Sequence, residues 1–465
     1  MTNVILFFTD QQRWDCSGLH GNPLDLMPNF DRLAHSGTHL FNHVTCAPVC
    51  GPARSCLQTG TYLSTNGAFQ NNIPLPGHLP TLAECFNEAG YHTGYIGKWH
   101  LAGPDGRADP DNRRGPVKES HRGGYKEWLA TETLEFSKHE YHTVLYDQEN
   151  QPVRLPGYRS DALTDASIRF IDRHRDKPFF LMTSCCEPHH QNDKDDYAPP
   201  DGYRERYTGR WTPPDLAALS AFSGYGLQGG TAQAHLGGYF GMVKRLDEAL
   251  GRIYDALKSL DLLENTILVF TSDHGCHFKT RNREYKRSCH ESSIRVPAML
   301  HGGPFTDGRC LRQPTNLVDI PPTLLDACGI DVPESMEGRS IMPLMRGQSE
   351  DWPEESLIQV CDEYPGRAVR TSRWKYCVMS DRLASDVGMD FDGATYDEAY
   401  LYDLQSDPYE LTNLIDNDAY TAVRERMRDR LVRRMKEIGE AEPNIQPVEP
   451  QRSGQHSLHP GEADQ

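Results

Sequence analysis

Short apolar runs alternate with amphipathic stretches over most of this chain. The apolar runs have strand length and few interruptions, as expected of strands buried on both faces of a sheet; they are residues 4–8, 91–96, 179–184 and 266–271. The amphipathic stretches repeat apolar residues at helical spacing, most clearly over residues 28–35, 82–89, 161–175 and 239–260. This alternation predicts an α/β fold, with a largely parallel sheet between helices on both faces.

Polar residues that could perform chemistry follow each predicted strand. They are Asp10-Gln11, Lys98-Trp99-His100, His189-His190 and Asp273-His274. Ligands of open α/β sheets bind beyond the carboxyl ends of the strands, so we expect these clusters to converge on one cleft. Residues 103–160 and 190–235 are polar, rich in Gly and Pro, and weakly periodic. We interpret them as insertions that border the cleft and set specificity.

The character of the sequence changes near residue 350. Short strands are predicted over residues 356–361, 368–380 and 400–404, followed by a basic amphipathic helix over residues 420–438. We therefore expect a catalytic α/β domain (residues 1–350), a smaller C-terminal α+β domain (residues 351–441) and a polar, loosely ordered tail (residues 442–465).

Composition narrows the possible partners and the cellular compartment. The chain has 465 residues and a net charge of −18, so a nucleic-acid partner is not expected. No apolar run approaches the ~20 residues of a membrane span, and the start of the chain has no basic segment typical of a signal peptide. The 13 cysteines are odd in number and scattered. These features together predict a cytoplasmic protein without a membrane partner.

The most informative motif is Cys50-Gly-Pro-Ala-Arg54. Pro52 suits the first turn of a helix, and Gly60 can end that helix with a left-handed cap. Cys50 would then lie at the helix N-terminus, where an anion is favoured and a thiol pKa is lowered, and Arg54 would lie one turn further on. The alternative is an inert buried cysteine, which is how we interpret Cys46 and Cys56.

Cys-x-Pro-x-Arg followed by Leu57-x-Thr-Gly60 resembles the signature of the type I sulfatases, members of the alkaline phosphatase-like superfamily. The stretch Leu401–Leu414 is also similar to sulfatase C-terminal domains. The resemblance implies that a formylglycine-generating enzyme oxidises Cys50 to formylglycine, whose hydrate is the nucleophile. It also implies a divalent cation, usually Ca²⁺, and a small sulfated substrate.

The resemblance assigns further roles residue by residue. The implied metal ligands are Asp10, Gln11, Cys50 after its modification, Asp273 and His274. Gln11 stands where the family often has a carboxylate, and His274 is a soft ligand for Ca²⁺, so Mg²⁺ and Mn²⁺ stay open. The implied catalytic residues are Cys50, Arg54, Lys98, His100, His189 and Lys286. His190 is an alternative to His189 as the acid that protonates the leaving group.

The predicted activity is hydrolysis of a sulfate monoester, with sulfated mono- or oligosaccharides as the expected substrates. One alternative is a phosphonate or phosphate ester hydrolase of the same superfamily, although such diesterases tend to lack the pair formed here by Lys98 and His100. Others are a non-catalytic scaffold that keeps Cys50 unmodified and a Cys-His hydrolase that uses the thiol directly. The last leaves the predicted metal ligands unexplained.

Overall fold

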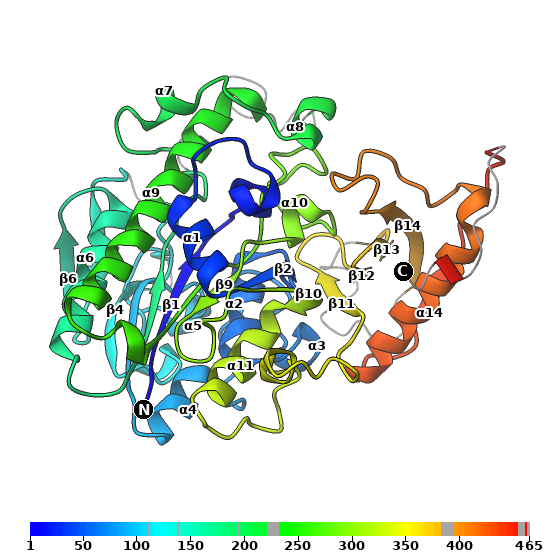
Figure 1. Cartoon of the computed structure of the whole chain (residues 1–465). Coiled ribbons are helices and arrows are strands. Elements are labelled where there is room, and N and C mark those ends of the chain that lie inside the picture. The colour runs from blue at the N-terminus through cyan, green and yellow to red at the C-terminus, as the bar shows by residue number, and fades with distance from the viewer. Residues whose placement is uncertain are drawn as a thin grey trace.

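A ten-stranded sheet forms the centre of the larger part of the molecule (Figure 1). This computed structural model describes residues 1–109, 111–136, 139–192, 195–220, 232–382, 395–453 and 461–462. The strand order is β10 (Arg309–Asn316), β2 (Thr38–Val44), β9 (Met299–His301), β8 (Thr266–Ser272), β1 (Asn3–Thr9), β7 (Phe179–Ser184), β3 (His92–Lys98), β4 (Glu127–Thr131), β5 (Thr143–Tyr146) and β6 (Pro152–Leu155). Strands β8, β1, β7, β3 and β4 run parallel, whereas β9, β5 and β6 pair antiparallel with their neighbours.

Helices cover both faces of this sheet. One face packs against α1 (Pro28–Ser36), α6 (Arg159–Arg173) and α9 (Ala232–Ser259), and the other against α2 (Cys50–Thr59), α4 (Leu82–Glu88) and α11 (Ile320–Ala327). Successive side chains of a strand point to opposite faces. In β1 this sends Ile5 and Phe7 to the first core, and Val4, Leu6 and Phe8 to the second. The predicted α/β fold is therefore confirmed.

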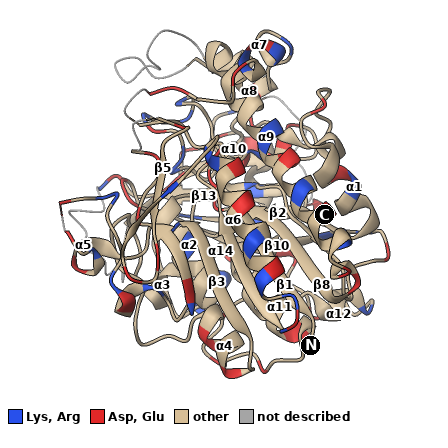
Figure 2. Cartoon of the chain, turned by 90° about the vertical axis from the view of Figure 1, so that its left-hand side faces the viewer, with Lys and Arg blue, Asp and Glu red and all other residues tan. Residues whose placement is uncertain are grey.

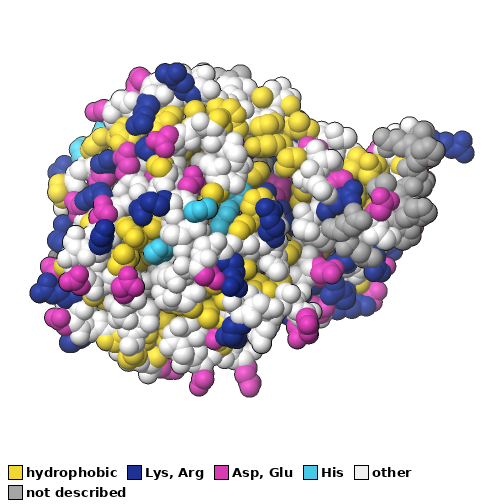
Figure 3. Space-filling view, viewed as in Figure 1, with side chains coloured by type: hydrophobic (Ala, Val, Ile, Leu, Met, Phe, Trp, Pro, Cys, Tyr) yellow, Lys and Arg dark blue, Asp and Glu magenta, His cyan; other side chains and the backbone are white. Residues whose placement is uncertain are grey.

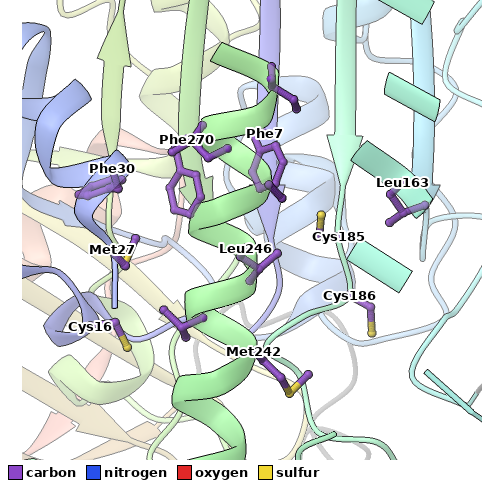
Figure 4. Packing of buried hydrophobic residues seen from close by; sticks show 14 of the residues in the cluster. Phe7, Cys16, Met27, Phe30, Leu163, Cys185, Cys186, Met242, Leu246 and Phe270 are labelled. Carbon is purple, nitrogen blue, oxygen red and sulfur yellow. The ribbon is translucent and has the colours of Figure 1, made fainter. Parts of the chain in front are cut away.

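The sheet and the helices that cover it differ in polarity, as expected when both faces of a sheet are buried. Figure 4 shows Phe7 and Phe270 near each other beside α9, which also carries Leu246 and Met242; the two rings stack 5.6 Å apart. In Figure 2 the central strands are almost free of charged residues, whereas Lys, Arg, Asp and Glu lie on the helices and loops. The sheet is thus buried on both faces and is open to polar chemistry only beyond its strand ends.

Helix α9 is longer than the sequence pattern predicts. It begins at Ala232, inside the stretch interpreted as an insertion. Its first turns carry Gly237, Gly238 and Gly241, where an added Cβ would meet residues 197–208 at contact distance or closer. These glycines permit close packing, but they also mask the helical periodicity on which the prediction depends.

Among its described residues, the C-terminal part, at the right of Figure 1, contains a five-stranded sheet and the long helix that packs on it. The strands are β11 (Glu355–Val360), β12 (Gly366–Thr371), β13 (Trp374–Met379), β14 (Thr395–Asp403) and β15 (Asn444–Gln446), and the helix is α14 (Thr421–Glu437). Residues 368–380, predicted as one strand, form two strands that turn at residues 372–373. Residues 444–446, predicted to lie in a loose tail, pair with β14 because Ile445 is buried in the core of this sheet.

The remaining helices are short, and several border the strand ends. They are α3 (Leu63–Asn66), α5 (Gly103–Gly106), α7 (Tyr203–Tyr207), α8 (Pro214–Ala218), α10 (Glu291–Ile294) and α12 (Met342–Met345). Within the described ranges, no helix combines the length and the apolar character needed to cross a membrane.

Candidate active site

The predicted polar clusters meet at one end of the large sheet, beside the N-terminus of α2. A cavity of about 420 Å³ opens there, and its wall includes Cys50, His100, His189, His190 and Lys286. Behind this wall Asp10, Arg54, Lys98, Asp273 and His274 are buried almost completely. The strand ends therefore converge as the fold principle predicts.

Helix α2 has the expected local structure. Cys50 is its first residue, Pro52 lies in its first turn, and Gly60 ends it with a φ of 67° while donating its N–H to the Cys56 carbonyl. The Cys50 Sγ lies 2.8 Å from Lys286 Nζ, 3.2 Å from His274 Nε2 and 3.5 Å from Asp10 Oδ1.

The expected lowering of the Cys50 pKa is wrong. Burial and the neighbouring Asp10 carboxylate raise the pKa of the Cys50 thiol to about 12, although Lys286 and Lys98 act in the opposite direction. Desolvation outweighs the helix N-terminus here. Because the encoded thiol stays protonated at neutral pH, this geometry does not favour a direct thiolate nucleophile.

Four side chains next to α2 are arranged as metal ligands. Asp10, Cys50, Asp273 and His274 each offer one atom, and these atoms lie within 4.8 Å of one another. His274 hydrogen-bonds through Nδ1 to the Gly275 carbonyl at 2.8 Å, so its Nε2 lone pair faces the two carboxylates. Burial and the charge of Asp10 raise the pKa of Asp273 to about 7. A pair of carboxylates beside an imidazole lone pair fits a divalent cation.

Gln11 joins this group through its backbone as well as its side chain. Its backbone N–H donates to Asp273 Oδ1 at 3.0 Å, and its Oε1 lies 3.5 Å from Lys286 Nζ. Its Nε2 lies 3.4 Å from the Tyr197 hydroxyl, to which it donates. The amide is therefore oriented with its oxygen toward the site, as a metal ligand requires.

Two buried cations balance the carboxylates. Arg54 donates to Asp10 at 3.0 Å and lies 3.2 Å from Asp273, while its other terminal nitrogen donates to Ser184 at 2.7 Å. Lys98 Nζ lies 2.7 Å from Asp10 and 2.9 Å from Glu135. Burial alone would lower the pKa of Lys98, but Asp10, Cys50 and Glu135 together hold it well above its usual value. Both residues thus carry positive charge next to position 50.

The histidines and Lys286 form the opposite wall. His189 Nε2 lies 3.2 Å from Lys286 Nζ, and its Nδ1 hydrogen-bonds to the His190 carbonyl at 2.7 Å. Burial and the Lys286 charge lower the pKa of His189 to about 3. His190 stacks between the His189 ring and the Tyr285 ring, at 4.4 and 4.1 Å. His189 is therefore the histidine that contacts Lys286, the closest hydrogen-bond partner of the Cys50 sulfur among the described residues.

Two residues of the site have unusual backbone conformations. Gln11 has a φ of 68° and His100 a φ of 62°, both in the left-handed region that residues other than glycine seldom adopt. Just before His100, a Cβ at Gly97 would lie 2.0 Å from the Ser184 carbonyl. The turn after β3 is therefore closely fixed against β7, and it places Lys98 and His100 at the cavity.

Glu135 is a further residue of the site that the sequence pattern does not reveal. This carboxylate is 3% exposed, contacts Lys98 at 2.9 Å and lies 4.0 Å from His100 Nδ1. Lys98, His100 and His189 lower its pKa in spite of its burial. Glu135 follows β4, so it obeys the same rule as the other strand-end residues. Strand β4 has the sequence Glu-Trp-Leu-Ala-Thr. Because this alternating segment is short, it was assigned to the predicted insertion at residues 103–160 and not to a strand.

Two family models match this chain. The sulfatase family model matches residues 2–330, and the model for the C-terminal part of N-sulphoglucosamine sulphohydrolase matches residues 283–437. The chain is 28% identical over 453 residues to an ulvan-active sulfatase of Formosa agariphila, an alignment that covers 94% of this chain and 82% of the relative.

Solved structures show the same fold. A putative sulfatase of Bacteroides fragilis superposes with a TM-score of 0.78 at 24% identity, covering 94% of this chain and 96% of the other. The phosphonate monoester hydrolase of Agrobacterium radiobacter superposes with a TM-score of 0.72, also at 24% identity and with the same coverage of both chains. The fold is thus that of the alkaline phosphatase-like proteins.

The family model spans well over half of the chain, so the chain belongs to the sulfatase family. It is a sulfuric ester hydrolase.

Proposed function

We propose that the protein hydrolyses sulfate monoesters of a carbohydrate, with the hydrate of a formylglycine made from Cys50 as the nucleophile. The observation that carries this proposal is the position of the Cys50 side chain. It lies within 3.5 Å of Lys286, His274 and Asp10 at the inner end of the cavity, yet its own thiol is protonated. The cations and the predicted metal ligands around position 50 would stabilise an oxyanion there, and a protonated thiol does not provide one.

The first half of the reaction transfers the sulfuryl group to the enzyme. One hydroxyl of the hydrate loses its proton to solvent water, and the resulting oxyanion attacks sulfur in line while the bond between sulfur and the alcohol oxygen breaks. Lys98 and Arg54 are positively charged and buried, so they stabilise the negative charge of the ionised hydrate oxygen at this end of the cavity. A divalent cation held by Asp10, Gln11, Asp273 and His274 would supply Lewis acidity.

The departing alcohol takes a proton from His189. In the free site this imidazole is neutral and faces the Lys286 ammonium 3.2 Å away. The negative charge of a bound sulfate would raise the pKa of His189, since an opposite charge nearby favours the charged form. Lys286 then binds the sulfate and orients the proton transfer.

The second half of the reaction releases sulfate without attack by water. His100 takes the proton of the remaining hydroxyl, whose oxygen forms the carbonyl bond as the bond from carbon to the sulfate oxygen breaks. The products are inorganic sulfate and the aldehyde, which water hydrates again. Burial and Lys98 lower the pKa of His100 to about 3, so it is neutral and able to accept the proton.

Two observations support a carbohydrate substrate. The cavity rim carries amide and guanidinium groups that can bind sugar hydroxyls, from Gln70, Asn71, Asn72, Arg113 and Asn192. The C-terminal part also matches a family named for a sulfated amino sugar.

The 13 free thiols support our further proposal that the protein acts in a reducing compartment, the cytoplasm.

The similarity to a phosphonate monoester hydrolase keeps that activity as the second candidate. Lys98 and His100 favour sulfate. Aryl sulfate and aryl phosphonate turnover by the same preparation would decide between them, and a larger kcat/KM for the phosphonate would reverse our assignment.

The modification itself is tested by mass spectrometry of the peptide that contains Cys50. The protein is expressed with and without a formylglycine-generating enzyme, and both preparations are assayed with an aryl sulfate. We expect activity in proportion to the converted fraction. Full activity in a preparation whose Cys50 is still a thiol would refute the formylglycine mechanism, and conversion without activity would favour a non-catalytic scaffold.

A further inference from the structure

A second cavity lies between the catalytic part and the C-terminal sheet. Its volume is about 610 Å³, and among the described residues it shares no lining residue with the catalytic cavity. Trp14 and His20, which follow β1, and Phe41 of β2 form one wall; Arg370 and Tyr409 of the C-terminal part form the other. Figure 3 shows histidine, hydrophobic and Lys or Arg side chains gathered near the middle of this face.

Positive charge is in excess in this cavity, although the chain carries a net charge of −18. Its described lining contains four arginines, Arg295, Arg312, Arg370 and Arg373, and one carboxylate, Glu291. Arg370 already engages Glu291 through two hydrogen bonds of 2.9 Å, and Arg373 lies 3.1 Å from Asp403. Among the described residues, Arg295 shares Glu291 with Arg370 at the longer distance of 3.7 Å, and Arg312 has no ion pair with a carboxylate.

Arg295 is the buried part of this excess. It is 6% exposed, and its Nε has no hydrogen-bond partner among the described residues. One terminal nitrogen donates to the Phe41 carbonyl at 2.8 Å, while the nearest carboxylate oxygen, on Glu291, is 3.7 Å away. Burial and the charge of Arg370 lower the pKa of Arg295 to about 9. An anion in the cavity would relieve this unfavourable burial.

Arg312 is the exposed part. Its guanidinium lies over the Phe41 ring, 4.6 Å from the ring centre, and no carboxylate of the described residues pairs with it. It therefore stands at the mouth of the cavity with all its N–H donors available, in the planar geometry that suits an oxyanion.

The rest of the wall is aromatic. Trp14 lies 5.7 Å from Tyr409 and 5.2 Å from His20, whose ring lies 4.9 Å from Phe41. The His20 Nδ1 has no hydrogen-bond partner within the described part of the chain. The Arg295 guanidinium lies over the Trp14 and Phe41 rings, 4.2 and 4.9 Å from their centres, so the aromatic rings and the guanidinium groups form one mixed surface. Such a surface suits a ligand that has both a ring and an oxyanion.

We propose that this second cavity binds a sulfated sugar unit, with the sulfate at Arg295 and Arg312 and the ring against the aromatic wall. This inference goes beyond the proposed reaction, because the binding needs neither formylglycine nor a metal ion.

The test is calorimetric titration of the full-length protein with glucose 6-sulfate, in a Cys50→Ala background that prevents turnover. Added Arg312→Gln should weaken one class of sites about tenfold or more, as expected for loss of a charge-assisted hydrogen bond. Arg32→Gln is the matched control. Arg32 is also exposed and lies over an aromatic ring, at 4.7 Å from the Tyr254 centre, but it does not line the cavity. Equal binding by the Arg312 and Arg32 variants would overturn the proposal, and so would an absence of binding.

Two further titrations identify the recognised group. Inorganic sulfate alone should bind more weakly than glucose 6-sulfate, and glucose alone should not respond to Arg312→Gln. If inorganic sulfate binds as tightly as the sugar sulfate, the ring contributes nothing and the sugar part of the proposal is wrong. Should Arg312→Gln disturb folding, Arg295→Lys, which keeps the charge but loses the planar donors, is expected to weaken the same sites.

Turnover separates this inference from the proposed function. In the formylglycine-containing enzyme, Arg312→Gln should keep the kcat of the wild type on a small aryl sulfate. Loss of aryl sulfatase activity in that variant would show that the second cavity is not independent of the catalytic one, and would contradict the inference while leaving the formylglycine mechanism in place.

Discussion

Two buried charge networks in this molecule have similar composition and different geometry. The catalytic network consists of Asp10, Arg54, Lys98, Glu135 and Asp273. The interface network, where α10 meets the C-terminal sheet, consists of Glu291, Arg370, Lys375 and Glu410. In the interface network Arg370 donates two hydrogen bonds of 2.9 Å to the Glu291 carboxylate, and Lys375 forms ion pairs with both Glu291 and Glu410.

The difference lies in what remains unpaired. In spite of its burial, Arg370 and Lys375 hold the pKa of Glu291 below its usual range, so this carboxylate is satisfied by the protein alone. Asp273 is not, because burial and Asp10 raise its pKa to about 7. Burial also raises the pKa of Glu410 in the interface network, so the contrast rests on Glu291 and Asp273. A carboxylate held by two cations fixes two parts of a fold together, whereas one whose pKa is raised is available to a ligand.

The largest expected effect is the loss of turnover in Cys50→Ala. Removal of a nucleophile typically costs at least about 10⁴-fold in kcat, while folding should be nearly unaffected because the side chain is small. Aryl sulfate assays and thermal unfolding check this expectation. Cys56→Ala on the same helix is the control and should retain activity. Retention of turnover by the Cys50 variant would remove the basis of our site.

Glu291→Gln tests the interface network. The substitution leaves Arg370 and Lys375 buried with a neutral partner, and we expect the free energy of unfolding to fall by about 3–5 kcal/mol. Urea denaturation measures this change. The kcat of the folded fraction should stay unchanged. Glu437→Gln, in an exposed ion pair, should cost less than about 1 kcal/mol. A large loss of kcat in the Glu291 variant would mean that the two networks are coupled.

His189→Ala tests the acid of the catalytic site. Alkyl sulfates have poor leaving groups and need a proton, so their kcat should fall by about 10²–10⁴, whereas aryl sulfates with acidic phenols should lose far less. His190→Ala is the matched control on the neighbouring residue. Equal losses for both substrate types would remove His189 from this role, and a selective loss in the His190 variant would transfer the role to His190.

Glu135→Gln is expected to have a moderate effect. Glu135 contacts Lys98 and lies 4.0 Å from His100, so misplacement of these partners should lower kcat by up to about 10² with little change in KM. The pH profile of kcat should also move, since a charge near His100 is lost. Steady-state kinetics between pH 5 and 9 measure both. An unchanged profile together with lower stability would assign Glu135 a purely structural role.

The smallest expected effect is on the pH dependence of the free energy of unfolding. A buried, neutral histidine contributes to it in both regions. Burial and Lys98 lower the pKa of His100 to about 3, and burial with Arg281 and Lys375 lowers that of His290 well below its usual value. Below about pH 6.5 the unfolded chain therefore binds more protons than the native one, so stability falls as pH falls. Each histidine contributes up to about 1.4 kcal/mol per pH unit.

Urea denaturation of His100→Gln and His290→Gln at pH 6.5 and 5.5 would measure this contribution. Each variant should lose a similar part of the pH dependence. A change in only one of them would show that the shared behaviour does not extend across both networks.

The fold and most of the site could be predicted because their signals are local. Continuous apolar strands such as β1 and β7, and polar residues directly after them, require only the rule that strand ends converge. Glu135 and the beginning of α9 could not be predicted, since their signals depend on tertiary packing: β4 is short, and the glycines of α9 are explained only by the segment that packs on them. The predicted lowering of the Cys50 pKa was wrong for the same reason. A position at the N-terminus of a helix does not tell how deeply the thiol is buried.

The backbone at Gln11 and His100 leaves a record that sequences of relatives could reveal. Both residues hold a left-handed conformation, at φ of 68° and 62°, that costs a residue with a side chain about 1–3 kcal/mol and glycine very little. Random drift under selection for folding alone would therefore fill these positions with glycine. Lineages that have kept the amide and the imidazole would be those still selected for the reaction, and glycine at either position would mark a descendant that has lost it.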